Sequence, residues 1–277
     1  MAEPNILDTI LAGKRDEVAD RSSRRPLPEV IAAARDAEPP RNFFKALTRD
    51  PEGGRGGGKR MNVIAEVKKA SPSAGVIAHD FDPTARALAY AEAGADALSV
   101  LTDEEHFRGS LDFLPPIKAA VDLPVLRKDF IVDTYQVWES RAAGADAVLL
   151  IAEALETNEL IDLQILATEL HMTTLLEVHS LENLMRVRDH VIGFPHKSYS
   201  LLGINNRDLT TFRTDLGTTT RMAELVEDRH TLVSESGIGC RADVDRLVAA
   251  GVRSALVGES LMRSGDVSAS MRDWFGV

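Results

Sequence analysis

VIAEVKKASPS, residues 63–73, is the stretch around which the rest of the chain is organised. It begins as an apolar strand and ends in a loop of small residues. In a strand, successive side chains point to opposite faces, so Glu66 and Lys68 share one face while Ala65 and Val67 share the other. A carboxylate and an ammonium on an otherwise apolar strand are costly to bury unless each has a partner. They form either a structural ion pair or part of an active site, and the other strands decide between the two.

Apolar strands alternate with helical patterns from Met61 onward. The eight expected strands are Val63–Val67, Ala97–Leu101, Pro124–Leu126, Ala147–Ile151, Thr173–Val178, Leu201–Ile204, Leu232–Val233 and Ser254–Val257. The expected helices between them are Pro83–Ala93, Phe113–Val121, Thr134–Ala143, Asn158–Leu170, Leu181–Val187, Thr218–Val226 and Ala242–Ala250. Strands that alternate with helices pair in parallel through helical crossovers. The pattern therefore predicts an α/β fold, a (β/α)8 barrel of the TIM type.

A weak internal repeat supports this count. Ala93–Ala97 and Ala143–Ala147 both read Ala-Gly-Ala-Asp-Ala, and Ala250–Val252 reads Ala-Gly-Val, each leading into an expected strand. Their glycines are about 25 to 27 residues apart per strand and helix, as expected for this kind of barrel. A doubly wound open sheet is the alternative. It would usually carry a glycine fingerprint after its first strand, where this chain has Ser71-Pro72-Ser73.

The residues before the first strand form a separate region. Residues 1–60 combine helical patterns, including a short helix at Asn42–Leu47 capped by its Asn, with the glycine-rich run Gly53–Gly58. That run lacks the Lys-Ser/Thr ending of a phosphate loop, and we interpret it as a flexible, solvated linker. We expect residues 1–60 to be a helical extension packed on the barrel and residues 61–277 to be the catalytic barrel, together forming a single domain.

Composition excludes several classes of function. A chain of 277 residues that is 44% hydrophobic and 27% charged can bury a large core. The net charge of -11 argues against a general affinity for nucleic acid or anionic membranes. The sequence has no bilayer-length apolar run, no signal-peptide core near its start and a single cysteine, Cys240. We therefore expect a cytoplasmic protein that binds neither nucleic acid nor a membrane.

Polar side chains gather where the expected strands end. In barrels of this kind, functional groups sit at the C-terminal ends of the strands. The chain places two lysines, three glutamates and an asparagine at such ends. They are Glu66, Lys68, Lys128, Glu177, Asn205 and Glu235. A lone ion pair is well explained as structural, whereas a ring of charges at one rim indicates an active site.

Two loops near the end of the chain indicate an anion site. Ser236-Gly237 and Gly258 allow backbone N–H groups to approach an anion closely, and a short helix after Gly258 would point its positive end at it. This is the usual place for a phosphate in a (β/α)8 barrel. Arg207 and the hydroxyl of Ser71 can complete the cradle. In the alternative interpretation, these glycines serve only tight turns.

Two other features are interpreted as structural. Glu177 and His179 are both metal-ligand types, but no second His or Asp pair ends a neighbouring strand in the way a metal site needs. Cys240 starts a helix, where a thiol can be activated, but it lacks an adjacent His. We therefore expect neither a bound metal nor a cysteine nucleophile.

The strand-end motifs together resemble the indole-3-glycerol phosphate synthase family. The matching segments are Ile64–Ser73, Leu126–Phe130, Leu176–His179, Gly203–Leu209 and Ser234–Ile238, and the likeness extends over nearly the whole chain. The resemblance implies a carbon–carbon lyase of tryptophan biosynthesis. Its small-molecule substrate would be 1-(2-carboxyphenylamino)-1-deoxyribulose 5-phosphate, whose ring closure releases CO2 and water without a cofactor. Family members are often monomers, which we also expect here.

The resemblance also implies roles for the charged residues. Lys128 corresponds to the general acid of the family, which protonates the ketone oxygen during ring closure. Glu66 and Glu235 would favour its protonated form. Glu177 fits the base that removes a proton during dehydration.

The remaining roles are less specific. Lys68 would be either a second acid or the partner of the departing carboxylate, and Asn205 would orient hydroxyl groups or the base. By position in the family, the slot for the aromatic ring consists of Phe107, Phe130, Leu209 and Phe212. Two alternatives remain open, a lysine Schiff-base aldolase on the same barrel and a non-catalytic barrel that binds a phosphorylated metabolite.

Overall fold

A closed barrel of eight parallel strands forms the centre of the computed structural model, which describes residues 6–51, 58–72, 74–78, 80–191, 199–208 and 211–277. The strands are β1 (Asn62–Val67), β4 (Ala97–Leu101), β5 (Val125–Lys128), β6 (Ala147–Ile151), β7 (Thr173–Val178), β8 (Ser200–Asn205), β9 (Leu232–Glu235) and β10 (Ser254–Val257). They close in the order β1-β10-β9-β8-β7-β6-β5-β4. The predicted (β/α)8 barrel is confirmed.

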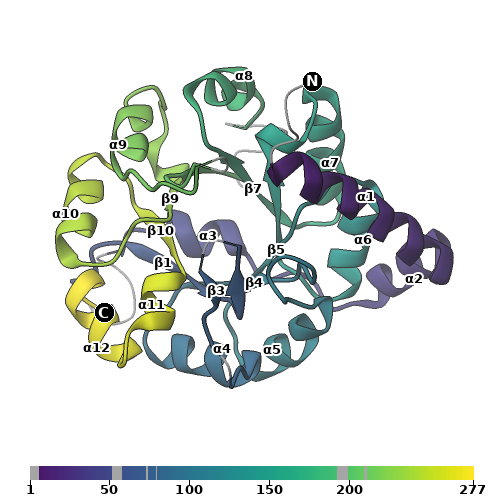
Figure 1. Ribbon diagram of the computed structural model, residues 1–277, viewed down its shortest axis with the longest axis horizontal. Coiled ribbons are helices and arrows are strands. Elements are labelled where there is room, and N and C mark those ends of the chain that lie inside the picture. The colour runs from purple at the N-terminus through teal and green to yellow at the C-terminus, as the bar shows by residue number, and fades with distance from the viewer. Residues whose placement is uncertain (1–5, 52–57, 73, 79, 192–198, 209–210) are drawn as a thin grey trace.

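Helices surround the barrel (Figure 1). They are α4 (Pro83–Glu92), α5 (Leu114–Ala120), α6 (Thr134–Ala142), α7 (Thr157–Glu169), α8 (Leu181–Val191), α9 (Gly217–Ala223), α10 (Arg241–Ala249), α11 (Glu259–Arg263) and α12 (Val267–Phe275). The seven predicted connecting helices are all present with shifted ends, and α12 was not predicted. Within the described part of the chain, no helix has both the length and the apolar character that crossing a membrane requires.

Three strands extend further than predicted at the end that matters for function, and one of them, β8, does so by a single residue, to Asn205. The apolar runs end at Leu126 and Val233, but β5 continues to Lys128 and β9 to Glu235. Lys128 pairs with Leu101 of β4, and Glu235 is paired with a residue of β8. The prediction ended these strands too early because it followed apolar character, whereas the backbone ladder continues beneath the charged side chains at the rim.

The Ala-Gly-Ala-Asp repeat connects helices to strands at the opposite end of the barrel. Gly94 and Gly144 both adopt a left-handed φ of 86°, which glycine accepts without strain. The carboxylate of Asp96 then accepts a 2.7 Å hydrogen bond from the backbone N of Val63. Asp146 does the same for the first residue of β5 at 2.7 Å. The repeat therefore fixes strand starts and takes no part in the charged rim.

The N-terminal helices α1 (Ile6–Arg24), α2 (Leu27–Asp36) and α3 (Phe43–Thr48) contact both ends of the barrel. In Figure 1, α1 crosses the side of α6 and α7, and its first turn reaches the C-terminal rim. The third helix begins at the predicted cap, where Asn42 accepts a 2.7 Å hydrogen bond from the N of Lys45. Its Leu47 carbonyl accepts hydrogen bonds of 2.8 and 2.7 Å from Asn62 and Ser254, the first residues of β1 and β10.

A short antiparallel hairpin of β2 (Ala70–Ser71) and β3 (Gly75–Val76) follows β1. It lies over the end of the barrel in Figure 1 and was not predicted, since the small residues there indicate only a loop. In the glycine-rich run, residues 53–57 lie outside the described residues. Its interpretation as a linker therefore stays a prediction, as does the division of the chain at residue 60.

Candidate active site

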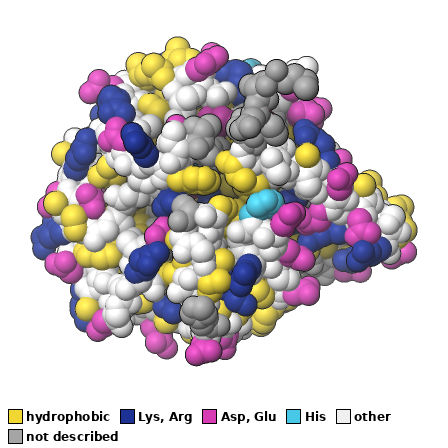
Figure 2. All heavy atoms as spheres, in the orientation of Figure 1, with side chains coloured by type: hydrophobic (Ala, Val, Ile, Leu, Met, Phe, Trp, Pro, Cys, Tyr) yellow, Lys and Arg dark blue, Asp and Glu magenta, His cyan; other side chains and the backbone are white. Residues whose placement is uncertain are grey.

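A cavity of about 490 Å³ opens at the C-terminal end of the barrel. Hydrophobic side chains gather at the centre of this face, with Lys and Arg side chains beside them (Figure 2). The predicted site residues that line the cavity are Glu66, Lys68, Ser71, Phe107, Lys128, Phe130, Glu177, Asn205, Arg207, Phe212, Glu235, Ser236, Gly237 and Gly258. The remaining predicted residue, Leu209, lies outside the described residues. Groups spread over more than 190 positions of sequence thus meet in one place.

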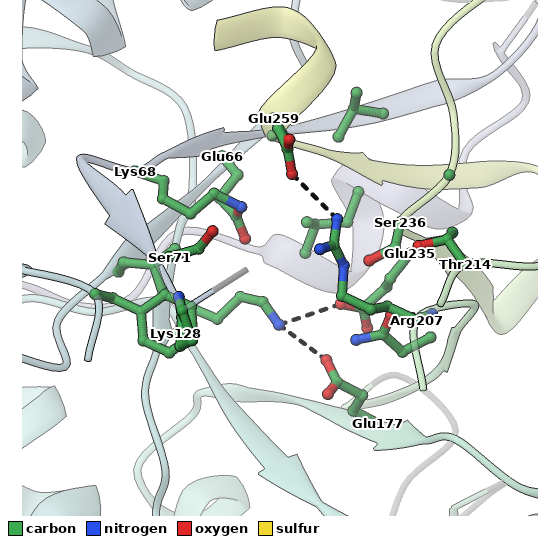
Figure 3. Close-up of a pocket in the computed structure, with 18 of the residues that line it drawn as sticks. Glu66, Lys68, Ser71, Lys128, Glu177, Arg207, Thr214, Glu235, Ser236 and Glu259 are labelled. Atoms are coloured by element: carbon green, nitrogen blue, oxygen red, sulfur yellow. Dashed lines mark hydrogen bonds and ion pairs between the residues drawn. The ribbon is translucent and has the colours of Figure 1, made fainter. Parts of the chain in front are cut away.

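Lys128 lies at the centre of a charged group (Figure 3). Its Nζ is 2.8 Å from Oε2 of Glu177 and 3.2 Å from Oε2 of Glu235. The three residues come from the ends of β5, β7 and β9, so three separate strands build the group. Glu177 and Glu235 are only 2% and 1% exposed. Charges this deeply buried persist only because each faces an opposite charge.

Burial and neighbouring charges together set the protonation of the group. Burial alone would lower the pKa of Lys128, but Glu177, Glu235 and Glu66 outweigh it and raise that pKa above its ordinary value. Burial would raise the pKa of Glu177, but Lys128 and His179 hold it well below the usual range. Burial and the charge of Glu177 raise the pKa of Glu235 well above that range. The two carboxyls therefore titrate as a coupled pair in which the proton prefers Glu235.

Glu66 and Lys68 form an ion pair beside this group. Glu66 lies on β1 and Lys68 directly follows its last residue, and Figure 3 shows both at the cavity, as alternation predicts. Ala65 and Val67 lie on the other face and are buried. Gly258 leaves room for the carboxylate, because a Cβ at that position would collide with Glu66. This gives Gly258 a packing reason in addition to the predicted approach of its backbone to an anion.

The predicted anion site combines unusual backbone geometry with two arginines. Ser236 and Gly237 adopt left-handed φ values of 65° and 79°, which is uncommon for serine and marks a position held by its surroundings. Arg207 contacts Glu259 at 3.1 Å, from Nη2 to Oε2, and Nε of Arg263 lies 3.1 Å from the other oxygen. Burial would raise the pKa of Glu259, but the two arginines lower it below its ordinary value.

Glu259 and Arg263 were not predicted as site residues, although both line the cavity. They are four residues apart on α11, a spacing that places two side chains on one helix face. The sequence contained that signal. It did not show that this face of a short helix turns back toward the rim.

Apolar side chains form another part of the wall. The rings of Phe107 and Phe130 lie 6.2 Å apart at 42°, a tilted arrangement that aromatic pairs favour. The first turn of α1 adds Ile6, Leu7 and Ile10. The helical pattern of this segment predicts only packing on the barrel, so the role of α1 as a wall of the cavity was not predicted.

Buried ion pairs hold α1 in that place. Lys14 is 2% exposed, and its Nζ lies 3.0 Å from Asp103 and 2.9 Å from Asp129. Arg127, which is fully buried, contacts Asp129 at 3.0 Å. Burial would raise the pKa of Asp129, but Arg127 and Lys14 lower it to about 2. Because Asp129 follows Lys128 directly, the same network fixes the end of β5.

Two features of the sequence were interpreted as structural, namely the metal-ligand residue types and Cys240. Among the described residues, no group of three or more His, Cys, Asp or Glu side chains has an arrangement that would hold a metal ion. Cys240 is exposed, and its Sγ lies 3.2 Å from a carboxylate oxygen of Asp243 at the start of α10. The expected absence of a metal and of a cysteine nucleophile stays a prediction.

Comparison with known proteins adds an independent finding. A family model described as indole-3-glycerol phosphate synthase matches residues 7–274. The protein of that name from Rhodopirellula baltica is 47% identical over 263 residues, which cover 95% of this chain and 96% of its own. The one from Rhodospirillum rubrum is 46% identical over 272 residues, or 98% and 99%. Both matches cover nearly the whole of this chain and of the relative.

Solved structures with the same fold are more distant. The 3-hexulose-6-phosphate synthase from Salmonella typhimurium has a TM-score of 0.60 at 14% identity and covers 76% of this chain and 95% of its own. A chain of the tryptophan synthase complex from Pyrococcus furiosus has a TM-score of 0.55 at 13% identity, covering 79% and 99%. At such low identity, these likenesses show the barrel fold alone.

Proposed function

The chain belongs to the indole-3-glycerol phosphate synthase family, and we propose that the cavity at its barrel rim performs the ring closure of that family with Lys128 as the general acid. The protein is a carbon–carbon lyase of tryptophan biosynthesis that acts on a small molecule. Its substrate is 1-(2-carboxyphenylamino)-1-deoxyribulose 5-phosphate, and the reaction releases CO2 and water to give indole-3-glycerol phosphate.

One observation carries the proposed division of roles. A protonated lysine lies 2.8 Å from one buried carboxylate and 3.2 Å from another at the floor of the cavity. During ring closure, the aromatic carbon that bears the carboxylate attacks the ketone carbon. The Lys128 ammonium donates a proton to the ketone oxygen as negative charge develops there. Loss of the carboxylate as CO2 then returns its bonding electrons to the ring and restores aromaticity.

The second half of the reaction expels the new hydroxyl as water. Glu177 is the base that removes a proton from the carbon next to the ring nitrogen, and its lowered pKa keeps it ionised for that task. Lys68 protonates the leaving hydroxyl or holds the carboxylate that departs, and Asn205 orients the hydroxyl groups. Glu177 and Glu66 keep Lys128 charged, and Glu235 adds to this when it is ionised.

The two ends of the substrate fit two parts of the cavity. The phosphate binds at the backbone and hydroxyl groups of Ser71, Ser236, Gly237 and Gly258 and at the guanidinium of Arg207. The aromatic ring lies against Phe107, Phe130 and Phe212, where apolar walls exclude water and strengthen local charges. Leu209 stays a predicted member of this slot. Local cations attract the anionic substrate against the net charge of -11.

A fluorescence assay for the indole product tests this proposal. The wild-type protein should convert the carboxyphenylamino sugar phosphate, and the dephosphorylated analogue should bind more weakly. Borohydride added during turnover should trap no adduct on Lys128 or Lys68. A covalent adduct that forms at the rate of turnover would instead support the Schiff-base aldolase. Binding without any product would support the non-catalytic barrel.

Other expectations from the sequence stay proposals. We propose that the protein acts in the cytoplasm, as a monomer and without a cofactor. Size-exclusion chromatography with light scattering would test the monomer. Activity after dialysis against a chelator would test the lack of a metal requirement.

A further inference from the structure

A buried histidine contacts the second carboxylate oxygen of Glu177. Lys128 lies 2.8 Å from Oε2 of Glu177, whereas Nε2 of His179 lies 3.2 Å from Oε1. The other ring nitrogen, Nδ1, lies 3.1 Å from Oε2 of Glu153. The His179 side chain is 7% exposed. Its imidazole therefore lies between two carboxylates, and one of them is the proposed base.

Glu153 fixes both the backbone and the ring of His179. Its Oε1 accepts a 2.9 Å hydrogen bond from the backbone N of His179, while its Oε2 faces the ring. Glu153 lies in a single 3-10 turn, η3 (Ala152–Ala154), directly after β6. Arg186 of α8 donates hydrogen bonds to the carbonyls of Ala152, the first residue of that turn, and of Leu155, the residue after it. The position of Glu153 is thus set by the fold and not by solvent.

The geometry restricts the protonation of His179. A neutral imidazole has one N–H donor and one lone pair, so one of its nitrogens would face a carboxylate oxygen with a lone pair. Only the imidazolium carries an N–H on both nitrogens and a positive charge, and its 3.2 Å contact from Nε2 to Glu177 is an ion pair, not an aligned hydrogen bond. A proton placed on Glu177 would relieve the conflict, but the Lys128 ammonium disfavours that arrangement.

We propose that His179, held as an imidazolium by Glu153, is a positioning residue that keeps Glu177 ionised and oriented for proton removal. The inference rests on the proposed function, because it takes Glu177 as the base. Burial alone would lower the pKa of His179, but Glu153 and Glu177 outweigh it and raise the pKa to about 10. The charged groups around Glu177 are then His179 from the loop after β7, Lys128 from β5 and Glu235 from β9.

The imidazolium also explains why the pKa values of the Glu177 and Glu235 carboxyls shift in opposite directions. Glu177 receives positive charge from both Lys128 and His179, whereas Glu235 contacts only the former among the described residues. The proton of the pair therefore goes to Glu235. Without the imidazolium, the two carboxyls become more alike, and the base spends more of its time protonated.

The variants His179→Asn and Glu153→Gln test the proposal. Each should lower kcat by about 10- to 100-fold, the usual cost of losing a partner that orients a functional side chain, with little change in KM. The acidic limb of the kcat profile should move to higher pH by about 1 to 3 units in His179→Asn, because a positive charge next to the base is lost. Glu153→Gln should move it in the same direction by less.

His171→Asn is the matched control. His171 precedes the other end of β7, is exposed and has a φ of 60°, which asparagine tolerates. This control should match the wild type in kcat, KM and pH profile. A merely structural role of His179 would lower kcat and thermal stability together but leave the acidic limb in place. That result, or an unchanged kcat in both test variants, would overturn the proposal.

A second measurement does not depend on activity. Long-range ¹H–¹⁵N spectra assign the His179 ring as the signal absent from His179→Asn. Both nitrogens should be protonated at pH 8, with a titration midpoint near 10 in the wild type and a lower one in Glu153→Gln. A midpoint near the ordinary value of about 6.5 would refute the imidazolium. If the wild type made no indole product, the proposed function would fail while this measurement still judged the charge of His179.

Discussion

Replacing Lys128 with methionine is expected to remove turnover and to lower the stability of the fold by an amount that grows from pH 5 to pH 8. The substitution keeps much of the side-chain volume but leaves Glu177 and Glu235 buried without the ammonium between them. Removing one partner of a buried ion pair costs about 3 to 5 kcal/mol. We expect the lower end, about 3 kcal/mol at pH 8, because the Lys128 side chain keeps 14% of its exposure. The loss of the acid should lower kcat by about 10²- to 10⁴-fold.

The sign of the pH effect follows from the direction of each pKa shift. In the wild type, the folded-state pKa of Lys128 is raised, so its contribution is fully present below the unfolded value of about 10.4 and is lost only in alkali. In the variant, burial raises the carboxyl pKa values above the unfolded value of about 4.3. Stability is then lost as pH rises through those folded values. The gap between variant and wild type should widen from pH 5 to pH 8.

Thermal unfolding followed by circular dichroism measures this gap. A loss of about 3 kcal/mol corresponds to a melting temperature lower by about 6 to 12 °C in a domain of this size. The gap should be clearly smaller at pH 5, where the carboxyls take up protons. Lys45→Met, at an exposed lysine of α3, is the matched control and should show no pH-dependent difference.

Two results would refute the reasoning about Lys128. An equal loss of stability at pH 5 and pH 8 would mean that the buried carboxyls do not rely on the ammonium for their charge. Turnover within about tenfold of the wild type would exclude Lys128 as the acid, since a positioned acid contributes more than that. The first result concerns the electrostatics and the second the mechanism, so the two can fail separately.

Three further predictions concern the substrate-binding walls. Arg207→Ala should raise KM by about 10- to 100-fold with kcat nearly unchanged, as for a lost charge-assisted hydrogen bond, and steady-state kinetics with an unchanged KM would remove Arg207 from the phosphate site. Glu259→Gln should lower KM by up to about fivefold, because it releases Arg207 from a partly exposed ion pair, and a higher KM would contradict this. Lys14→Met removes the ammonium from the buried carboxylates of Asp103 and Asp129, of which Asp129 keeps Arg127, and should lower the free energy of unfolding by about 3 kcal/mol in urea titrations. A loss below about 1 kcal/mol would mean that apolar contacts hold α1 in place.

The barrel and its charged rim could be predicted because both follow from local pattern. A buried parallel strand is a continuous apolar run, and Ala147–Ile151 or Thr173–Val178 can be recognised without knowledge of any partner strand. The functional end of each strand is then where that run meets a charge. The same rule placed the ends of β5 and β9 too early, since it cannot see backbone pairing beneath Lys128 and Glu235.

The supporting residues could not be predicted because they depend on contacts between distant segments. Glu153 follows a strand whose end looked uncharged, and it reaches His179 only because a single 3-10 turn redirects the chain. The stripe of α1 that includes Ile6 and Ile10 is equally suited to a barrel surface and to a cavity wall. The buried ion pairs of Lys14 with two aspartates, together with the ion pairs of Arg21 with Glu104 and Glu139, hold this helix against the barrel.

The two buried glutamates show how far residue type determines chemistry. Glu177 lies near the end of β7 and Glu235 ends β9, with β8 between them, and both contact Lys128, yet the first is held ionised and the second favours its proton. Glu235 extends over Gly203, where a Cβ would collide with it, and within the described residues its Oε1 has no hydrogen-bond partner. A base and a carboxyl that favours its proton thus arise from the same residue type. Glu177 receives a second positive charge from His179, whereas at Glu235 Lys128 alone opposes the effects of burial and of the Glu177 charge. Neighbouring side chains from separate strands therefore determine which of the two glutamates carries the proton. Substitutions at those neighbours should change that preference.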